Sequence, residues 1–395
     1  MNILIINSGS SSIKFQLIEM PSETLICSGL VERIGQQDAI LNYKTERVSL
    51  KLTETIETHD QGLNKIVSLL LDSKNGVIKS TDDIAVVGHR VVHGGDTFSD
   101  TALITSDVKK DIEQFSALAP LHNPSNLKGI LVAEAFFPLA KQVAVFDTAF
   151  HQSIPEKAKR YAIPSALYKE HKIQVYGFHG TSHQYVSKKA TDYLGLKSSK
   201  IITIHLGNGC SMTAIKDGKS IDHSLGFTPS NGLIMGTRSG DIDHGVIFHL
   251  TNTLGYDIND VKKLLTNESG MLGLTGYADL RDIQSEAEKG NQDCILALEM
   301  NTYRIKKYIG AYVAAMNGLD AIVFTAGIGE NSNLIRTLTC SDMDYFGIDL
   351  DQTKNDSKSD ALREINSAKS KVKILVIPTN EELEIAKQAY KLIVE

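Results

Sequence analysis

Short hydrophobic runs alternate with helical patterns along the whole chain. The opening has an apolar run, a small polar turn and a second apolar run, which predicts strand, turn and strand. Later apolar residues recur either at every second position or with helical spacing. The first 150 residues therefore predict strands at 2–6, 13–18, 40–53, 84–87 and 143–146, and helices at 63–71 and from Asn123, with Asn123 as N-cap and Pro124 as first helical residue.

The opening pattern returns half a chain later. The stretch IITIHLGNGCSMTAIKDGK, from residue 201, repeats the apolar strand, Gly-rich turn and strand of ILIINSGSSSIKFQLIE, with Gly207 aligned to Gly9. A hairpin found twice indicates a duplicated unit. The remainder predicts helices at 257–266, 280–289 and 292–316, strands at 322–324 and 372–377, and a closing helix from Asn380. Alternating strands and helices indicate the α/β class.

Length and composition limit the functional classes. A chain of 395 residues is too long for one hydrophobic core and favours two or three domains. A net charge of −6 argues against a nucleic-acid-binding surface. The four cysteines lie far apart without zinc spacing, no signal peptide is evident, and no apolar run is long enough for a membrane helix. We therefore expect a cytoplasmic protein with reduced thiols that acts on small molecules.

One segment leaves the domain organisation open. Residues 351–371 form a polar run rich in Lys, Asp and Ser, which fits an interdomain linker. The same run is compatible with a helix and a surface loop inside the second domain.

Three Gly-rich turns follow apolar strands, at 7–14, 205–211 and 325–331. Glycine lets the backbone approach a ligand closely, and successive N–H groups can bind an anion. A single turn of this kind is usually structural, but three in one chain favour nucleotide binding. Neither the P-loop signature nor G-x-G-x-x-G is present, and Asp217-Gly218 fits a hairpin turn better than the end of a P-loop.

Charged residues at strand ends are the next candidates. Arg90 follows an apolar strand and precedes His93-Gly94-Gly95, Asp147 ends a buried strand, and Arg238 lies among small residues. Taken alone, each could be a surface residue or a cap. Two arginines in Gly-rich surroundings favour clamps for phosphate or carboxylate, because the guanidinium group binds these anions with two parallel hydrogen bonds.

His179 and His183 lie four residues apart, as zinc ligands on a helix would. No third ligand follows at a suitable spacing, so His179 is better interpreted as a hydrogen-bond donor to an anion. His183 is expected to cap or pack against the following helix.

The chain resembles the acetate kinase family of the acetate and sugar kinase/Hsp70/actin superfamily from residue 1 to about residue 390. The resemblance is carried by an ordered set of motifs: NSGSSSIK (7–14), GHRVVHGG (88–95), PLHNP (120–124), FDTAFH (146–151), GFHGTSH (177–183), HLGNG (205–209), MGTRSGD (235–241), TAGIGEN (325–331) and PTNEE (378–382). It implies two similar actin-like (ribonuclease H-like) domains with a duplicated core and an active site in the cleft between them. The expected domains are residues 1–147 with 385–395, and residues 148–384.

The resemblance also implies roles for individual residues. Asn7 and Glu381 would hold Mg²⁺, for which Mn²⁺ can substitute. Asp147, His179, Arg238 and Arg90 would be catalytic, with Arg90, Val92, Leu121 and Pro229 binding the substrate. The nucleotide would be bound by Lys14, His205, Leu206, Gly207, Asn208, Gly209, Asp279, Leu280, Arg281, Gly327, Ile328, Gly329, Glu330 and Asn331.

The implied reaction is reversible transfer of the γ-phosphoryl group of ATP to acetate by a homodimer, without nucleic acid or membrane partners. A carboxylate is already ionised at pH 7, so it needs no general base, and we expect Asp147 to orient an arginine or a metal-bound water. Propionate or butyrate kinase is the alternative, and an Hsp70- or actin-like regulatory ATPase is a more remote one. The sequence departs from the family pattern at Ser230, Asn231, His244 and Tyr277, which would bear on the shape of the substrate pocket and on ribose contacts.

Overall fold

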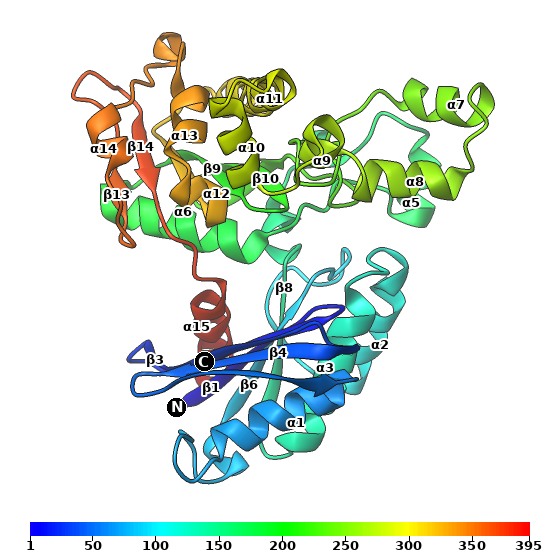
Figure 1. The fold of residues 1–395 in the computed structure, drawn as a ribbon, viewed down its shortest axis with the longest axis vertical. Helices are drawn as coiled ribbons and strands as arrows, with labels where there is room; N and C mark the ends of the chain where they lie inside the picture. Colours follow the sequence, from blue (N-terminus) through cyan, green and yellow to red (C-terminus); the bar gives the residue numbers. More distant parts are fainter. The chain divides into compact units, whose positions relative to one another are not determined.

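The computed structural model describes all residues from 1 to 395, which form two compact units (Figure 1). The first unit comprises residues 1–150 and 380–395, and the second comprises residues 151–379. The sequence placed the return point at 384/385, inside the C-terminal helix α15 (Glu381–Val394). The observed division precedes that helix, so Glu381 and Glu382 belong to the first unit.

The first unit is built on an eight-stranded sheet in the order β5-β4-β3-β2-β1-β6-β8-β7. Besides α15, its elements are β1 (Asn2–Ser8), β2 (Ser12–Glu19), β3 (Thr24–Glu32), β4 (Gln36–Thr45), β5 (Ser49–Ile56), α1 (His59–Leu70), η1 (Thr81–Asp83), β6 (Val86–Val91), β7 (Ala102–Leu103), α2 (Ser106–Gln114), η2 (Phe115–Ala117), α3 (Asn123–Phe136) and β8 (Lys141–Phe146). A 3-10 turn, η3 (Ala149–Ser153), leads into the second unit.

Alternation along β1 explains how this sheet is covered on both faces. Leu4 and Ile6 belong to a core cluster that includes residues of α1 and α3. Ile3 and Ile5 belong to a different cluster, which includes Ile385 of α15. Because successive strand side chains point to opposite faces, one short apolar run supplies both cores and is buried throughout.

The second unit is built on a six-stranded sheet in the order β11-β10-β9-β12-β14-β13. Its elements are α4 (Glu156–Lys159), α5 (Ser165–His171), α6 (Gly180–Leu194), β9 (Lys200–Leu206), β10 (Cys210–Lys216), β11 (Lys219–His223), α7 (His244–Asn252), α8 (Ile258–Asn267), α9 (Gly270–Thr275), α10 (Leu280–Glu288), α11 (Gln292–Met316), β12 (Ala321–Thr325), α12 (Ala326–Asn331), α13 (Asn333–Cys340), η4 (Asp344–Phe346), α14 (Gln352–Asp356), β13 (Arg363–Glu364) and β14 (Lys373–Val376).

The two sheets share a core of the same order and direction. In each, an antiparallel hairpin (β1–β2, β9–β10) is followed by two strands parallel to its first strand and by a short antiparallel edge strand. The alignment of Gly9 with Gly207 places both glycines directly after the first strand. The predicted α/β fold with two similar, duplicated units is confirmed.

Several local predictions were wrong or incomplete. Strand β3 was missed because Gly29 interrupts its pattern; a Cβ there would lie 2.4 Å from the ring of Phe15, so the strand needs glycine. The strand expected at 84–87 is β6, which begins at Val86 because Ile84 ends η1. Of the two interpretations of the run at 351–371, the linker is wrong and the helix within the second unit is correct: α14 and β13 lie in it.

The predictions of the long helix, of the cap of the C-terminal helix and of one hairpin turn are confirmed. The long helix at 292–316 is α11, and Asn380 caps α15 by accepting a hydrogen bond from the backbone N–H of Leu383. Asp217 and Gly218 form the hairpin turn between β10 and β11, both with positive φ. All four cysteines are free and buried. None of the helices combines the length and hydrophobicity needed to cross a bilayer.

Candidate active site

In the first unit, charged side chains gather where parallel strands β6 and β8 end. Arg90, near the end of β6, donates from Nε to Asp147 Oδ1 over 2.9 Å and from Nη2 to Oδ2 over 2.7 Å. Asp147 directly follows β8, and its N–H donates to the carbonyl of Val91. Glu381, the first residue of α15, lies 3.9 Å from Arg90 Nε. The strand-end residues singled out in the sequence thus meet as a bidentate pair with a second carboxylate beside it.

The local charges shift the pKa values of this group. Burial acts to lower the pKa of Arg90, but the charges of Asp147 and Glu381 outweigh it and raise that pKa. Burial, together with the charges of Asp147 and Glu382, raises the pKa of Glu381, against the opposing effect of Arg90. Arg90 is therefore a permanently charged group in a fixed orientation, and Glu381 is a carboxylate whose pKa is raised mainly by burial.

The first hairpin brings a lysine to the same group. Asn7 and Lys14 are directly opposite in the β1–β2 ladder. Lys14 Nζ lies 2.6 Å from Glu382 Oε1; the lysine side chain is half exposed, whereas that of Glu382 is buried. The structure thus places Lys14 in an ion pair, and Asn7 in the strand beside it.

The residues proposed for the substrate methyl differ in exposure. Val92, just after β6, is buried, and its N–H donates to the side chain of Asn126, whereas Leu121 is 72% exposed. The prediction that Asn123 caps α3 is wrong: the N-cap is His122. The Asn123 amide instead accepts from the N–H of His93 and donates to its carbonyl, because it is buried beneath that loop.

In the second unit, the turn from His205 to Gly209 joins β9 to β10. The N–H of Gly207 donates to the carbonyl of Gly209 over 3.1 Å, which closes the turn. A Cβ at Gly209 would lie 3.4 Å from Cε1 of His179, so the turn packs against that ring. The rings of His179 and His205 also stack, with centroids 4.4 Å apart. His179 and the phosphate-binding turn predicted from sequence are therefore neighbours.

His179 and His183 lie at the start of α6. His179 is its N-cap, with a left-handed φ of 56°, and its side chain accepts no capping hydrogen bond from the helix backbone. Of the two roles expected for His183, capping is wrong, because this residue lies inside α6, where it is packed, fully buried and hydrogen-bonded to Thr203 and Ser211. Its burial there follows from the helical spacing, which turns His183 toward β9 and β10.

Arg238 has very different surroundings from Arg90. Its Nη1 donates to the carbonyl of Pro229 over 2.8 Å, and it makes no ion pair in the structure. Burial lowers its pKa. The loop needs glycine around it, since a Cβ at Gly270 would lie 2.2 Å from the carbonyl of Met235. A partly buried guanidinium without a carboxylate partner is a site that an anion would stabilise.

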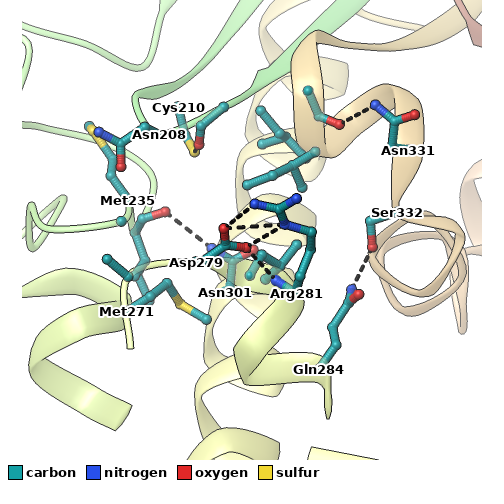
Figure 2. A pocket seen from close by; sticks show the side chains of 18 residues that line it. Asn208, Cys210, Met235, Met271, Asp279, Arg281, Gln284, Asn301, Asn331 and Ser332 are labelled. Atoms are coloured by element: carbon teal, nitrogen blue, oxygen red, sulfur yellow. Dashed lines mark hydrogen bonds and ion pairs between the residues drawn. The ribbon is translucent and has the colours of Figure 1, made fainter. Parts of the chain in front are cut away.

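A pocket of about 630 Å³ opens in the second unit beside these residues (Figure 2). One part of its wall is apolar and another carries amides, a hydroxyl and an ion pair. It is lined by Leu206, Gly207, Asn208, Cys210, Ile234, Met235, Gly236, Met271, Ala278, Asp279, Leu280, Arg281, Gln284, Asn301, Gly327, Ile328, Asn331 and Ser332. Most residues assigned to the nucleotide by resemblance thus line one cavity of a size that suits a cofactor.

Five residues of that predicted set do not line the pocket, and one of them, Lys14, belongs to the first unit. His205 Nδ1 is hydrogen-bonded to the hydroxyl of Ser182, and Gly209 packs on His179. Gly329 is buried against β12, and the Glu330 side chain accepts from the N–H of Thr379.

The expected Gly-rich turn at 325–331 is a helix, α12, that starts directly from β12. Ala326 and Gly329 form the buried face of α12, so Gly327 and Ile328 face the pocket.

Some lining residues were missed in the sequence. Gln284 lies one turn after Leu280 on α10 and donates to Ser332 Oγ over 2.6 Å, as Figure 2 shows. Helical spacing from Leu280 could have indicated Gln284. Met271 and Asn301 gave no such signal, because they enter the pocket only through the packing of α9 and α11.

Asp279 and Arg281 form an ion pair at the pocket wall (Figure 2). Asp279 caps α10, accepting from the N–H of Arg281 over 2.8 Å and from its Nη2 over 2.6 Å. The hydrogen bonds from the Arg281 side chain and backbone lower the pKa of Asp279 to about 2. The pair is exposed, so its role is to orient both side chains more than to stabilise the fold.

Comparisons with known proteins agree along the whole chain. The sequence model of the acetokinase family matches residues 2–387. An acetate kinase of Flavobacterium johnsoniae is 62% identical over 393 residues, and acetate kinase 2 of Clostridium perfringens is 47% identical over 397; each match covers 100% of both chains. Among solved structures, Porphyromonas gingivalis acetate kinase has a TM-score of 0.94 at 44% identity, and a propionate kinase from Francisella tularensis has 0.92 at 41%; each match covers 99% of both chains.

Proposed function

The chain belongs to the acetokinase family, and we propose that it catalyses the reversible transfer of the γ-phosphoryl group of ATP to acetate, giving acetyl phosphate and ADP. The observation that carries this proposal is the pocket of about 630 Å³, because its lining includes most of the residues that the family resemblance assigned to the nucleotide. Its apolar wall suits a base, and its amides and glycines suit ribose and phosphates.

Acetate would be bound through its carboxylate. Arg90 is held by Asp147 in one orientation and offers a planar set of donors to a second carboxylate. The apolar side chains of Val92, Leu121 and Pro229 would contact the methyl group. Asp147 is already committed to Arg90, which supports an orienting role and not that of a general base.

Transfer then requires stabilisation of charge on the moving phosphoryl group. A carboxylate oxygen attacks the γ-phosphorus, a new P–O bond forms, the bond to the β-phosphate oxygen breaks and ADP leaves. Arg238, which has no carboxylate partner, and His179 would donate hydrogen bonds to the equatorial oxygens. The turn from His205 to Gly209 would bind a neighbouring phosphate, and Lys14 would exchange Glu382 for ATP phosphates.

We propose Mg²⁺ as the metal, with Mn²⁺ as a substitute. In the first unit, the three carboxylates Asp147, Glu381 and Glu382 outnumber the cations Arg90 and Lys14. That surplus of negative charge fits a divalent cation, which binds through one or two carboxylates and the substrate phosphates. Glu381 and Asn7 would hold it, and when bound it would neutralise phosphate charge.

The size of the substrate pocket determines which carboxylic acid is preferred. The similarity to both an acetate kinase and a propionate kinase of known structure supports propionate or butyrate as alternative substrates. One methylene in an apolar pocket changes kcat/KM by only about 10–200-fold. Val92 and Pro229 are therefore the residues whose size should set the preference.

Hydroxylamine trapping of the acyl phosphate tests the proposal. ATP, Mg²⁺ and acetate, propionate or butyrate are supplied in parallel, and the hydroxamate is measured. Acetate is expected to give the highest kcat/KM. No hydroxamate from any acid, with ATP hydrolysis unaffected by acid, would overturn the proposal in favour of a regulatory ATPase.

We also propose a cytoplasmic homodimer. Helix α7 has no buried residue and lies beyond α8 at one end of the second unit (Figure 1). The segment around it exposes large apolar side chains, namely Ile242, Val246, Phe248, Leu254, Tyr256 and Ile258. Exposed patches of this kind are typical of protein interfaces. The buried free thiols fit a reducing compartment.

A further inference from the structure

A cluster of histidines surrounds the start of α6, and the proposed reaction uses only His179 and, in the phosphate-binding turn, His205. Their ring centroids lie 4.1–6.0 Å from one another in a connected group. The members are His151, His179, His183, His205 and His223. Burying so many imidazoles together costs free energy unless each ring nitrogen has a hydrogen-bond partner.

Two of these rings hold the backbone just before His179. The N–H of Phe178 donates to Nε2 of His223 over 3.1 Å, and the carbonyl of Phe178 accepts from Nε2 of His151 over 3.0 Å. Backbone groups have fixed roles, so His223 must carry its proton on Nδ1 and His151 on Nε2. Burial lowers the pKa of His151 to about 4, which keeps it neutral. The backbone that leads into His179 is thereby held on both sides.

A second chain of hydrogen bonds reaches the His179 ring itself. Ser211 Oγ lies 2.8 Å from Nδ1 of His179 and 2.7 Å from Nε2 of His183. Nδ1 of His183 lies 2.6 Å from Oγ1 of Thr203. The Ser211 hydroxyl has one hydrogen, so it donates to one imidazole and accepts from the other. The chain can therefore run in only two directions while His183 is neutral.

Thr203 decides between these directions. Its side chain is fully buried, and its hydroxyl has His183 as its one hydrogen-bonding partner in the structure. If His183 donated to Thr203, the threonine hydrogen would be buried without an acceptor, which costs free energy. If Thr203 donates to His183, then His183 donates to Ser211 and Ser211 donates to Nδ1 of His179. In that direction every hydrogen along the chain has an acceptor.

We propose that Thr203, His183 and Ser211 are positioning residues that hold neutral His179 in the tautomer with its proton on Nε2. Nδ1 of His179 is then an acceptor, and Nε2–H is the group that can donate to a phosphoryl oxygen. Burial lowers the pKa of His183 well below its usual value, so the chain is not interrupted by a second proton. The catalytic consequence rests on the proposed phosphoryl transfer, whereas the tautomer itself does not.

The direct test is nitrogen NMR of histidine-labelled protein, in which protonated and bare ring nitrogens have distinct chemical shifts. The full chain is used without substrates, and the His179 signals are assigned from the spectrum of His179→Ala. The wild-type ring is expected to show a protonated Nε2 and a bare Nδ1. A protonated Nδ1 with a bare Nε2 in the wild-type protein would overturn the proposal.

Thr203→Val and Thr203→Ser form a matched pair for the same measurement. Valine preserves the shape of the strand residue but removes the hydroxyl, so neither direction of the chain is favoured. Thr203→Val should therefore give a mixture of both His179 tautomers and a kcat lowered about twofold, while Thr203→Ser keeps the wild-type spectrum. A Thr203→Val spectrum identical to wild type would overturn the role of Thr203.

Ser211→Ala tests the link to turnover. Losing one hydrogen bond to a reacting group should lower kcat about tenfold with little change in KM for ATP, and Ser211→Thr should recover most of the loss. Full kcat in Ser211→Ala would overturn the positioning role. If the wild-type protein forms no acyl phosphate, the proposed function fails, yet the NMR result still decides the tautomer.

Discussion

Arg90 and Arg238 were predicted to share one task, but the structure gives them opposite surroundings. Arg90 is bound by Asp147 through two hydrogen bonds and has Glu381 nearby, which raises its pKa. Arg238 is bound by one carbonyl and has no carboxylate partner, and burial lowers its pKa. An arginine that is already paired with a carboxylate can orient a substrate, whereas a guanidinium without a counter-ion is stabilised most when an anion binds. In the proposed mechanism, Arg90 would therefore orient the substrate and Arg238 would stabilise charge.

The largest effect is expected from removing the arginine without a partner. Arg238→Ala should lower kcat by about a thousandfold or more, the range for a guanidinium that stabilises a phosphoryl transition state. Its free energy of unfolding should change little, because only one bond to Pro229 is lost. Steady-state kinetics and thermal unfolding measure both quantities.

Arg304→Ala is a suitable control for Arg238→Ala. Arg304 lies in the same unit and donates to the same loop, to the carbonyls of Gly232 and Asp241, but unlike Arg238 it has a carboxylate partner, Asp241. The Arg304→Ala variant should retain most of the wild-type kcat. Equal losses in the two variants would mean that the loop structure, not the charge of Arg238, is what matters.

Asp147→Asn should have the next largest effect. The amide cannot accept both hydrogen bonds, so Arg90 loses its fixed orientation. A hydrogen bond to a charged group contributes about 1.5–3 kcal/mol, which corresponds to a roughly ten- to hundredfold loss in kcat/KM for acetate. Asp147→Glu keeps the charge and should recover part of it, with a pH–rate profile of unchanged shape. An acid limb that moves with the substitution would instead indicate proton transfer by Asp147.

Glu381→Gln should change stability and activity in opposite ways, because Glu381 lies beside Arg90 as a buried carboxylate and is also a proposed metal ligand. Burial raises the pKa of Glu381 above its usual 4.5, so the folded protein holds this proton to higher pH than the unfolded chain. Stability is then lost as pH rises through the window between the two pKa values, and the loss persists above it. Glu381→Gln should remove that loss: in EDTA, its unfolding temperature should be equal to or above that of wild type at pH 7.

The same variant should need more Mg²⁺ for half-maximal activity, because a proposed metal ligand is gone. An unchanged Mg²⁺ requirement would remove Glu381 from the metal site. A variant less stable than wild type at pH 7 would contradict the electrostatic argument.

Asp279→Asn should have the smallest effect. Asp279 and Arg281 are exposed, and such pairs contribute little because water screens them. KM for ATP is expected to rise by less than about fivefold, with kcat unchanged. A large fall in kcat would show that the pocket wall takes part in transfer as well as in binding.

The core of the fold could be predicted because apolar periodicity depends on residues that are close together in the sequence. Short-range patterns determine each hairpin, the duplication that aligns Gly9 with Gly207, and the long helix α11. Strand β3 was not predicted, because Gly29 is required by the ring of Phe15 in the neighbouring strand, and no local pattern encodes that contact.

The same distinction applies to the candidate site. Arg90 and Asp147 were marked by their positions at strand ends, and parallel pairing then brings them together. Asn123 was misread as a cap because Asn before Pro is a strong local signal, while its actual partner, His93, is distant in sequence. The hydrogen-bond chain through Thr203, His183 and Ser211 combines three elements, so only the folded structure shows it.

The central claim is direct transfer between ATP and acetate, with no covalent phosphoryl group on the protein. The measurement that tests it most directly is the configuration at phosphorus in acetyl phosphate made from ATP with a chiral γ-phosphoryl group. A single in-line displacement predicts inversion. Net retention would contradict the account, since it requires an even number of displacements and hence a phosphorylated residue on the protein.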